Sequence, residues 1–202
     1  MIDTFLFDMG NVLVHFSHPL MCQQIAAVCG SSAAEIQRLL FDLKWQQAFE
    51  SGELTEAQFQ ARLENHFQRP IDLPALVHAA SDIFTLNTPM VPILQSLRRQ
   101  GKRLVLLSNT SISHVEFVRR QFDVLSYFDD LVLSYEVGAM KPQPAIFHAA
   151  LHKILCPPER CFYTDDIPAY IEAARQHGFQ AEVFTTAESL QGQLASRGVS
   201  VC

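Results

Sequence analysis

The chain begins with a short apolar run that ends in one carboxylate and passes directly into a turn. Residues 5–13 have the sequence FLFDMGNVL, in which Asp8 precedes Gly10 and Asn11. A short apolar run bounded by turn residues is typical of a buried strand in a parallel sheet. Ligands of open α/β sheets bind at the carboxyl ends of such strands, where Asp8 falls. On this segment alone Asp8 fits two roles equally, a cap of the following turn or a chemically active carboxylate.

Composition limits the kinds of protein to consider. The 202 residues suffice for one domain with a small insertion, and 49% of them are hydrophobic. The sequence shows no secretory signal and no membrane-spanning run, so we expect a cytoplasmic protein without a membrane partner. A formal net charge of -6 without long basic runs argues against a nucleic-acid partner. The five scattered cysteines predict reduced thiols rather than a disulfide framework or a zinc site.

Residues 17–86 have a helical period and no convincing strand, which predicts an inserted helical module. Helix starts are indicated at Ser17, Ser32, Thr55 and Asp72, and the second and third of these have the capping-box pattern. Gly30 and Gly52 are expected to end helices. Four or five short helices in this stretch would form a compact bundle.

From residue 87 onward, helices and apolar strands alternate. Thr88 and Pro89 predict the start of a helix that ends at Gly101, and strands are expected over about 102–107, 131–133, 161–164 and 181–184. This alternation implies βαβ units around a parallel sheet to which the first strand also belongs. We therefore predict an α/β fold, a Rossmann-like parallel sheet core (residues 1–16 and 87–202) with an inserted α-helical cap (residues 17–86).

Polar residues of particular kinds follow the predicted strands. Because parallel strands deliver their carboxyl ends to one edge of the sheet, we expect these residues to converge on Asp8. Three carboxylates placed together favour a divalent cation, and oxygen ligands suit Mg²⁺. A hydroxyl, nearby backbone N–H groups and an ammonium would complete a phosphate site. The residues concerned are Ser108, Asn109, Lys141, Asp165 and Asp166.

In this order and spacing the chain resembles the haloacid dehalogenase-like (HAD) hydrolase superfamily, in which a helical C1 cap is inserted between the first two motifs. Two further segments are similar to the bacterial sugar-phosphatase branch that includes α-D-glucose-1-phosphate phosphatases. These are the Asp-x-Gly-Asn opening and Glu53-Leu54-Thr55 after Gly52. The four motifs lie at Phe7 to Leu13, at Ser108-Asn109-Thr110, at Lys141 within Ser134 to Pro142, and at Asp165-Asp166.

The resemblance implies a Mg²⁺-dependent phosphatase acting on a small phosphorylated metabolite, a sugar phosphate above all. Asp8 would be the nucleophile and form an aspartyl-phosphate, while Ser108 and Lys141 hold the phosphoryl oxygens beside Asn109. By the family pattern, Mg²⁺ would be bound by Asp8, by the carbonyl of Gly10 and by Asp166. Asp165 would support the metal site from behind. Oligomeric state is not predicted.

Position 10 departs from the family pattern. Phosphatases of this family usually carry a second aspartate there, which protonates the leaving oxygen and later activates water, whereas this chain has Gly10. A positioned acid/base contributes about 10²- to 10⁴-fold to the rate, so slower turnover or a leaving group that hardly needs a proton is expected. His15 is a candidate substitute acid, weighed against a structural role. Val12 and Tyr170 also depart from the pattern, and Trp45 fits a cap core better than a sugar-binding wall.

Two alternatives stay open at this stage. The missing acid at position 10 is consistent with a catalytically impaired phosphate-binding or regulatory protein. A 2-haloacid dehalogenase uses the same aspartate nucleophile to attack a carbon atom. The resemblance implies that such enzymes lack a carboxylate pair at the position of the fourth motif. The pair Asp165-Asp166 therefore argues against a dehalogenase.

Overall fold

A five-stranded parallel sheet forms the centre of the computed structural model, which describes residues 2–201. The strand order is β5-β4-β1-β6-β7, so the first strand of the chain belongs to the same sheet as the later strands, as predicted, and lies in its middle. The strands are β1 (Thr4–Phe7), β4 (Arg103–Ser108), β5 (Asp130–Leu133), β6 (Cys161–Asp165) and β7 (Gln180–Val183). All four neighbouring pairs are parallel, which confirms the Rossmann-like core.

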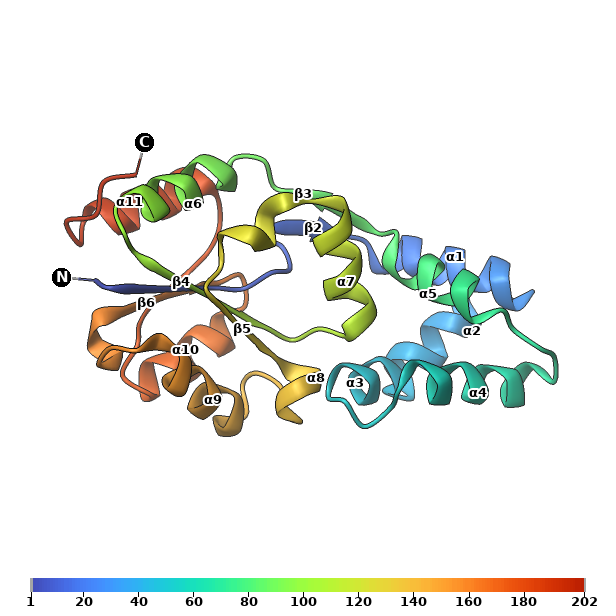
Figure 1. Cartoon of the computed structure of the whole chain (residues 1–202). Helices are drawn as coiled ribbons and strands as arrows, with labels where there is room; N and C mark the ends of the chain where they lie inside the picture. Colours follow the sequence, from blue (N-terminus) through green and yellow to red (C-terminus); the bar gives the residue numbers. More distant parts are fainter. Residues whose placement is uncertain (1, 202) are drawn as a thin grey trace.

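Helices cover both faces of this sheet (Figure 1). Alternate residues of β1 point to opposite faces, so Phe5 and Phe7 pack with one helix layer and Leu6 with the other. The first layer contains α6 (Met90–Arg99), α7 (Ile112–Gln121) and α11 (Ala187–Ala195). The second contains α9 (Pro144–Ile154) and α10 (Pro168–Gln176). Shorter connections are η2 (Asp123–Tyr127), α8 (Ser134–Val137) and η3 (Pro158–Arg160).

A second group of helices extends from one end of the sheet and has a hydrophobic core of its own (Figure 1). It begins directly after the first strands and returns before α6, so it is an inserted helical cap, as predicted. The bounds at residues 17 and 86 stay a prediction. The cap comprises α1 (His18–Cys29), α2 (Ala33–Gln37), the π-helical turn η1 (Arg38–Asp42), α3 (Trp45–Glu50), α4 (Glu56–Phe67) and α5 (Leu73–Ser81).

The predicted helix starts in the cap are confirmed. The side chains of Ser17, Ser32, Thr55 and Asp72 each accept a hydrogen bond from a backbone N–H in the first turn of their helix. The full capping box forms only at Thr55, because the Glu35 side chain, which would complete the box at Ser32, pairs with other residues. Local sequence thus determines where these helices begin.

Two local predictions were wrong. The stretch 17–86 contains a strand, because β3 (Phe84–Leu86) pairs antiparallel with β2 (Val14–Phe16) in a short ribbon where the chain enters and leaves the cap. A strand of three residues carries too little periodicity to be recognised in a sequence. Helix α6 has Pro89 rather than Thr88 at its N-cap, without a side-chain cap.

No helix within residues 2–201 is both long and apolar enough to cross a membrane. Of the five cysteines, Cys202 lies outside the described residues, and the other four are free thiols. Three of these, Cys22, Cys29 and Cys161, are buried in hydrophobic surroundings.

Candidate active site

The register of the central strands brings the predicted site residues to one edge of the sheet. Phe7 lies opposite Leu106 of β4 and Thr164 of β6, so Asp8 is level with the ends of both neighbouring strands. The Asp8 backbone N–H donates to the Thr164 carbonyl oxygen at 3.1 Å, which fixes the nucleophile candidate beside Asp165. Because β1 is the central strand, residues at the carboxyl ends of β4 and β6 flank Asp8 on both sides.

The Lys141 side chain is buried between two carboxylates. Its Nζ lies 2.8 Å from Asp8 Oδ1 and 2.6 Å from Asp165 Oδ2, and it also donates to the Leu107 carbonyl oxygen at 3.1 Å. Burial alone would lower the pKa of Lys141, but the charges of Asp8 and Asp165 outweigh it and the pKa is raised. Lys141 therefore remains a cation in a site whose entrance faces the cap.

The Asp8 carboxyl has a pKa raised to about 7, chiefly because burial penalises its charged form. The Lys141 ammonium opposes this rise, and the charge of Asp165 adds to it. A nucleophilic carboxylate must be ionised to attack. The protein alone leaves Asp8 partly protonated near neutral pH, so added positive charge beside it would favour the reactive form.

Asp165 and Asp166 have different surroundings. Asp165 is fully buried and accepts hydrogen bonds at both oxygens, from Lys141 and the Tyr163 hydroxyl at Oδ2 and from the Ile167 N–H at Oδ1. Asp166 is partly exposed, and its Oδ2 accepts a hydrogen bond from Asn11 Nδ2 at 2.9 Å. Asp165 is thus already engaged, whereas Asp166 still has an oxygen for a further partner.

The donor set fits a hard divalent cation. One carboxylate oxygen from each of Asp8, Asp165 and Asp166 lies within 4.8 Å of the others. Three carboxylates and the one ammonium of Lys141 leave two negative charges when all are ionised, which one divalent cation would neutralise. Oxygen-only ligands of this kind suit Mg²⁺ better than metals that prefer nitrogen or sulfur.

Ser108 is the last residue of β4 and Asn109 follows it, but the two side chains have different partners. Ser108 is 1% exposed and lines a small cavity beside Gly10. The Asn109 amide brackets the Lys141 backbone, accepting from its N–H at 2.7 Å and donating to its carbonyl oxygen at 3.0 Å. Asn109, predicted to bind substrate, therefore also holds the loop that delivers Lys141.

Two neighbouring cavities that share lining residues lie between this edge of the sheet and the cap. The inner cavity, of about 40 Å³, borders the sheet edge, and its lining includes Gly10, Ser108, Thr110, His18 and Glu50. The outer cavity, of about 460 Å³, lies toward solvent and shares His18 and Glu50 with the inner one. It is also lined by Phe41, Lys44, Gln46, Gln47, Lys141, Gln143 and Tyr170. A small phosphorylated molecule fits a site of this size and polarity.

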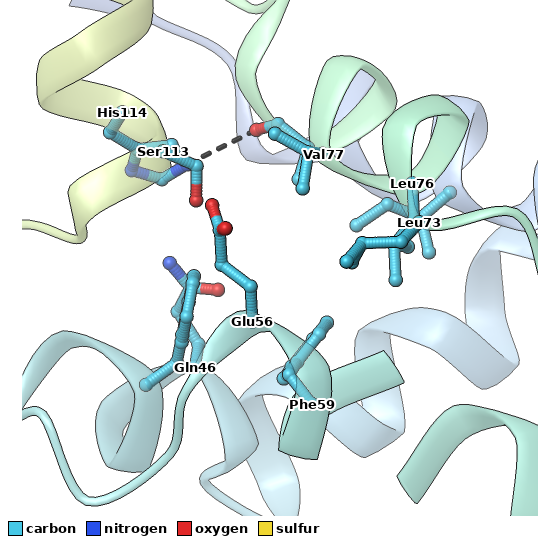
Figure 2. Close-up of a pocket in the computed structure, with 11 residues that line it drawn as sticks. Gln46, Glu56, Phe59, Leu73, Leu76, Val77, Ser113 and His114 are labelled. Carbon is cyan, nitrogen blue, oxygen red and sulfur yellow. Dashed lines mark hydrogen bonds between the residues drawn. The ribbon is translucent and has the colours of Figure 1, made fainter. Parts of the chain in front are cut away.

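A third cavity of about 20 Å³ lies between cap helices and α7, and Figure 2 shows Gln46, Glu56 and His114 around it. Asp8, Ser108 and Lys141 are not among its lining residues. The His114 ring nitrogen Nε2 lies 3.1 Å from the Ala80 carbonyl oxygen, which links α7 to α5. This cavity belongs to the packing of the cap on the core.

His15, the candidate substitute acid, lies away from the site. His15 is exposed on β2 and lines neither the inner nor the outer cavity, whereas His18 lines both. Trp45 packs against the cap core, with the Arg62 guanidinium over its ring and the His66 ring edge-on to it, as its predicted structural role requires. Tyr163 and Glu50 were missed. The sequence pattern predicts Tyr163 as one more apolar residue of a strand. It predicts Glu50 as a carboxylate on the surface of a helix.

A profile of the family described as haloacid dehalogenase-like hydrolase matches residues 2–178. The chain belongs to this HAD-like hydrolase family. The match spans most of the chain and includes every residue of the site described above. The membership that the four motifs predict is therefore confirmed.

Relatives of this HAD-like hydrolase include phosphatases. The chain is 27% identical over 191 residues to Phosphatase MT3486 of Mycobacterium tuberculosis, covering 89% of this chain and 86% of that protein. It is 24% identical to the D-ribitol-5-phosphate phosphatase of Bacteroides thetaiotaomicron, covering 89% and 90% of the two chains. A predicted HAD-like family hydrolase from Porphyromonas gingivalis has the same fold, with a TM-score of 0.82, 24% identity and 98% coverage of both chains.

Proposed function

We propose that this protein is a Mg²⁺-dependent phosphatase that hydrolyses a small phosphorylated metabolite through an aspartyl-phosphate on Asp8. The observation that carries the proposal is the buried Lys141 ammonium held 2.8 Å from Asp8 and 2.6 Å from Asp165 at the cap-facing edge of the sheet. The phosphatase relatives support the same activity.

Each residue has a distinct task in this proposal. An Asp8 carboxylate oxygen attacks phosphorus, and the ester oxygen leaves on the opposite side. Lys141 and the Ser108 hydroxyl hold the phosphoryl oxygens, which carry the developing charge. Water then attacks the phosphorus of the aspartyl-phosphate and regenerates the Asp8 carboxylate.

The residues that would hold Mg²⁺ are Asp8, the carbonyl of Gly10 and Asp166, with Asp165 orienting Lys141 from behind. The metal, when bound, neutralises charge on the carboxylates and the phosphoryl group. A HAD family enzyme from Bacteroides thetaiotaomicron with a TM-score of 0.82 to this chain has been solved as a magnesium complex, which supports the assignment.

The outer cavity supports a sugar phosphate as substrate. Its lining offers the amides of Gln46, Gln47 and Gln143 and the ammonium of Lys44, with only Phe41 and Tyr170 as aromatic surfaces. Amides pair well with hydroxyl groups because they both donate and accept hydrogen bonds. The D-ribitol-5-phosphate phosphatase among the relatives acts on a molecule of this class.

The four free thiols are consistent with the cytoplasm as the compartment of this protein.

Release of inorganic phosphate across a panel of phosphorylated metabolites, with and without Mg²⁺, tests this proposal. We expect release from sugar or polyol phosphates that requires Mg²⁺ and is abolished in Asp8→Asn. Binding of phosphate esters without release of inorganic phosphate would instead support a catalytically impaired phosphate-binding protein. The missing acid at position 10 is the observation that favours this alternative. Activity that survives Asp8→Asn would contradict the mechanism.

A further inference from the structure

We propose that Glu50 of the cap is the general acid and base of this site, in place of the aspartate that family members carry at position 10. The inference rests on the proposed phosphatase function and adds the group that completes its proton transfers. It makes the cap a contributor to the chemistry and not only a cover.

Glu50 is a carboxylate that lines both cavities. It is the last residue of α3, and it borders the inner cavity together with Gly10 and Ser108. It also borders the outer cavity together with Lys141. A substrate whose phosphoryl group lies between Asp8 and Ser108 would place its ester oxygen on the cap side, because Asp8 attacks from the sheet side and the leaving oxygen departs opposite.

The position of Glu50 is fixed by the core. Its backbone carbonyl oxygen accepts a hydrogen bond from the Ser134 hydroxyl at 2.6 Å, at the end of β5. Gln46 Nε2 donates to Glu50 Oε1 at 2.8 Å, one helical turn earlier. Two residues later Gly52 passes so close to Tyr135 that a Cβ built on it would lie 2.3 Å from the Tyr135 carbonyl oxygen. These contacts hold the Glu50 backbone and one of its carboxylate oxygens in place beside the two cavities that the residue lines.

The surroundings of Glu50 suit a proton donor. Withdrawal from water raises the pKa of Glu50 to about 7, and the Asp8 charge adds to the rise while the Gln46 hydrogen bond opposes it. A general acid needs a pKa near the working pH. The other titratable groups that line these cavities are His18, Lys44, His114, Lys141 and Tyr170.

A buried hydroxyl in the inner cavity also points to a polar occupant. Thr110 is 1% exposed, and its Oγ1 has no hydrogen-bond partner within residues 2–201. It lines the inner cavity with Glu50 and Ser108. A buried hydroxyl without a partner costs free energy, so a substrate oxygen placed between Thr110 and Glu50 would satisfy it.

His18 is the rival for this role, because it lines the same cavities. Its ring lies between Phe16 and Phe41, with centroid distances of 4.9 and 4.8 Å, and burial lowers its pKa. The lowered pKa favours the neutral imidazole and so weakens His18 as a proton donor. Glu50 gains proton affinity from the same burial, which favours it over His18.

The two proton transfers balance. In the first step an Asp8 oxygen forms a bond to phosphorus and the phosphorus–ester oxygen bond breaks. The Glu50 carboxylic acid gives its proton to that oxygen, which leaves as an alcohol. In the second step the Glu50 carboxylate takes a proton from water as the water oxygen bonds to phosphorus and the bond from Asp8 breaks. Phosphate leaves, and Asp8 and Glu50 regain their starting states.

Leaving-group dependence in Glu50→Gln tests the inference. We expect the first turnover of an alkyl sugar phosphate to slow by about 10²-fold or more, because its alkoxide must be protonated. An aryl phosphate with an acidic phenol should release that phenol in the first turnover within a few-fold of the wild-type rate. The aspartyl-phosphate should then accumulate, giving a burst followed by slow turnover, because its hydrolysis lacks a base.

Two controls make the result specific. Glu53→Gln changes an exposed carboxylate three residues away and should leave both substrates unaffected. Equal slowing of both substrates in the first turnover of Glu50→Gln, no slowing, or the selective pattern appearing in His18→Asn instead would overturn the inference. The proposed function is judged separately, by whether wild-type activity exists and is lost in Asp8→Asn.

Discussion

The Phe16 ring occupies the space that a side chain at Gly10 would need. A Cβ built on Gly10 would lie 2.8 Å from Phe16 Cε1 and 3.4 Å from Cδ1. Phe16 is itself held by rings on two sides, His18 at 4.9 Å and Phe84 at 6.3 Å between centroids. The packing of Phe16 at the entrance of the cap therefore leaves no room for the aspartate that is usual at position 10.

Gly10→Asp should consequently fail to improve the enzyme. The new side chain would displace Phe16 and lower the free energy of unfolding by about 1–3 kcal/mol, the usual cost of overpacking. Combining it with Phe16→Ala should cost less than the sum of the single changes, since the two residues contact each other. Urea unfolding and phosphate release measure both effects. Wild-type stability together with faster turnover in Gly10→Asp alone would contradict the account.

The amide of Asn11 should tune the affinity for Mg²⁺. Asn11 has φ 55°, and its Nδ2 donates to Asp166. Asn11→Gly tolerates the same backbone conformation but loses that hydrogen bond, so about tenfold more Mg²⁺ should be needed for half-maximal activity. Gln68→Gly, at a helix end with φ 53°, is the matched control and should not change the requirement. An unchanged Mg²⁺ titration in Asn11→Gly would show that Asp166 needs no such partner.

The close approach at Gly52 should make that position far less tolerant than Gly101. Both have positive φ, 77° and 68°, but a Cβ on Gly101 would have nothing within 4 Å. Gly101→Ala should cost about 1–2 kcal/mol of backbone strain. Gly52→Ala adds the collision with the Tyr135 carbonyl oxygen, which cannot rotate away, and should cost about 2–5 kcal/mol. It should also lower kcat, since Glu50 would move. Equal unfolding free energies for the two variants would disprove this contact.

His114 should make the fold sensitive to mild acid. Burial lowers the pKa of His114 from 6.5 to about 4, so between these values the unfolded chain binds the extra proton. Stability from this residue is present above about pH 6.5 and falls as the pH drops toward 4. Going from pH 7 to pH 5 should cost wild type about 2 kcal/mol more than His114→Gln, whose amide can still donate to Ala80. Parallel curves of unfolding free energy against pH would contradict this assignment.

Most of the core follows from local patterns in the sequence. The alternation of apolar strands and capped helices predicts the parallel sheet, and the strand ends predict that Asp8, Ser108, Lys141 and Asp165 meet. These predictions succeed because strand burial and helix capping depend on neighbouring residues. The helical period and capping patterns of residues 17–86 likewise predict the inserted helical module.

The contacts between cap and core could not be predicted in the same way. The position of Glu50 depends in part on Ser134, 84 residues later, which donates a hydrogen bond to its carbonyl oxygen. The Tyr163 hydroxyl donates a hydrogen bond to Asp165. From the sequence pattern, Tyr163 is expected only to be a buried core residue. Phe16 is structurally important because its ring lies against Gly10, and this contact depends on the turn between the two residues. Such pairings depend on how the elements pack in three dimensions, which periodicity does not encode.

The most direct test of the central claim is to trap the aspartyl-phosphate. Protein turning over a sugar phosphate with Mg²⁺ would be quenched in acid and its peptides measured by mass spectrometry. We predict one added phosphoryl group on the peptide that contains Asp8, absent without Mg²⁺ and absent in Asp8→Asn. Steady phosphate release without any such label, or with a label on another residue, would contradict the account.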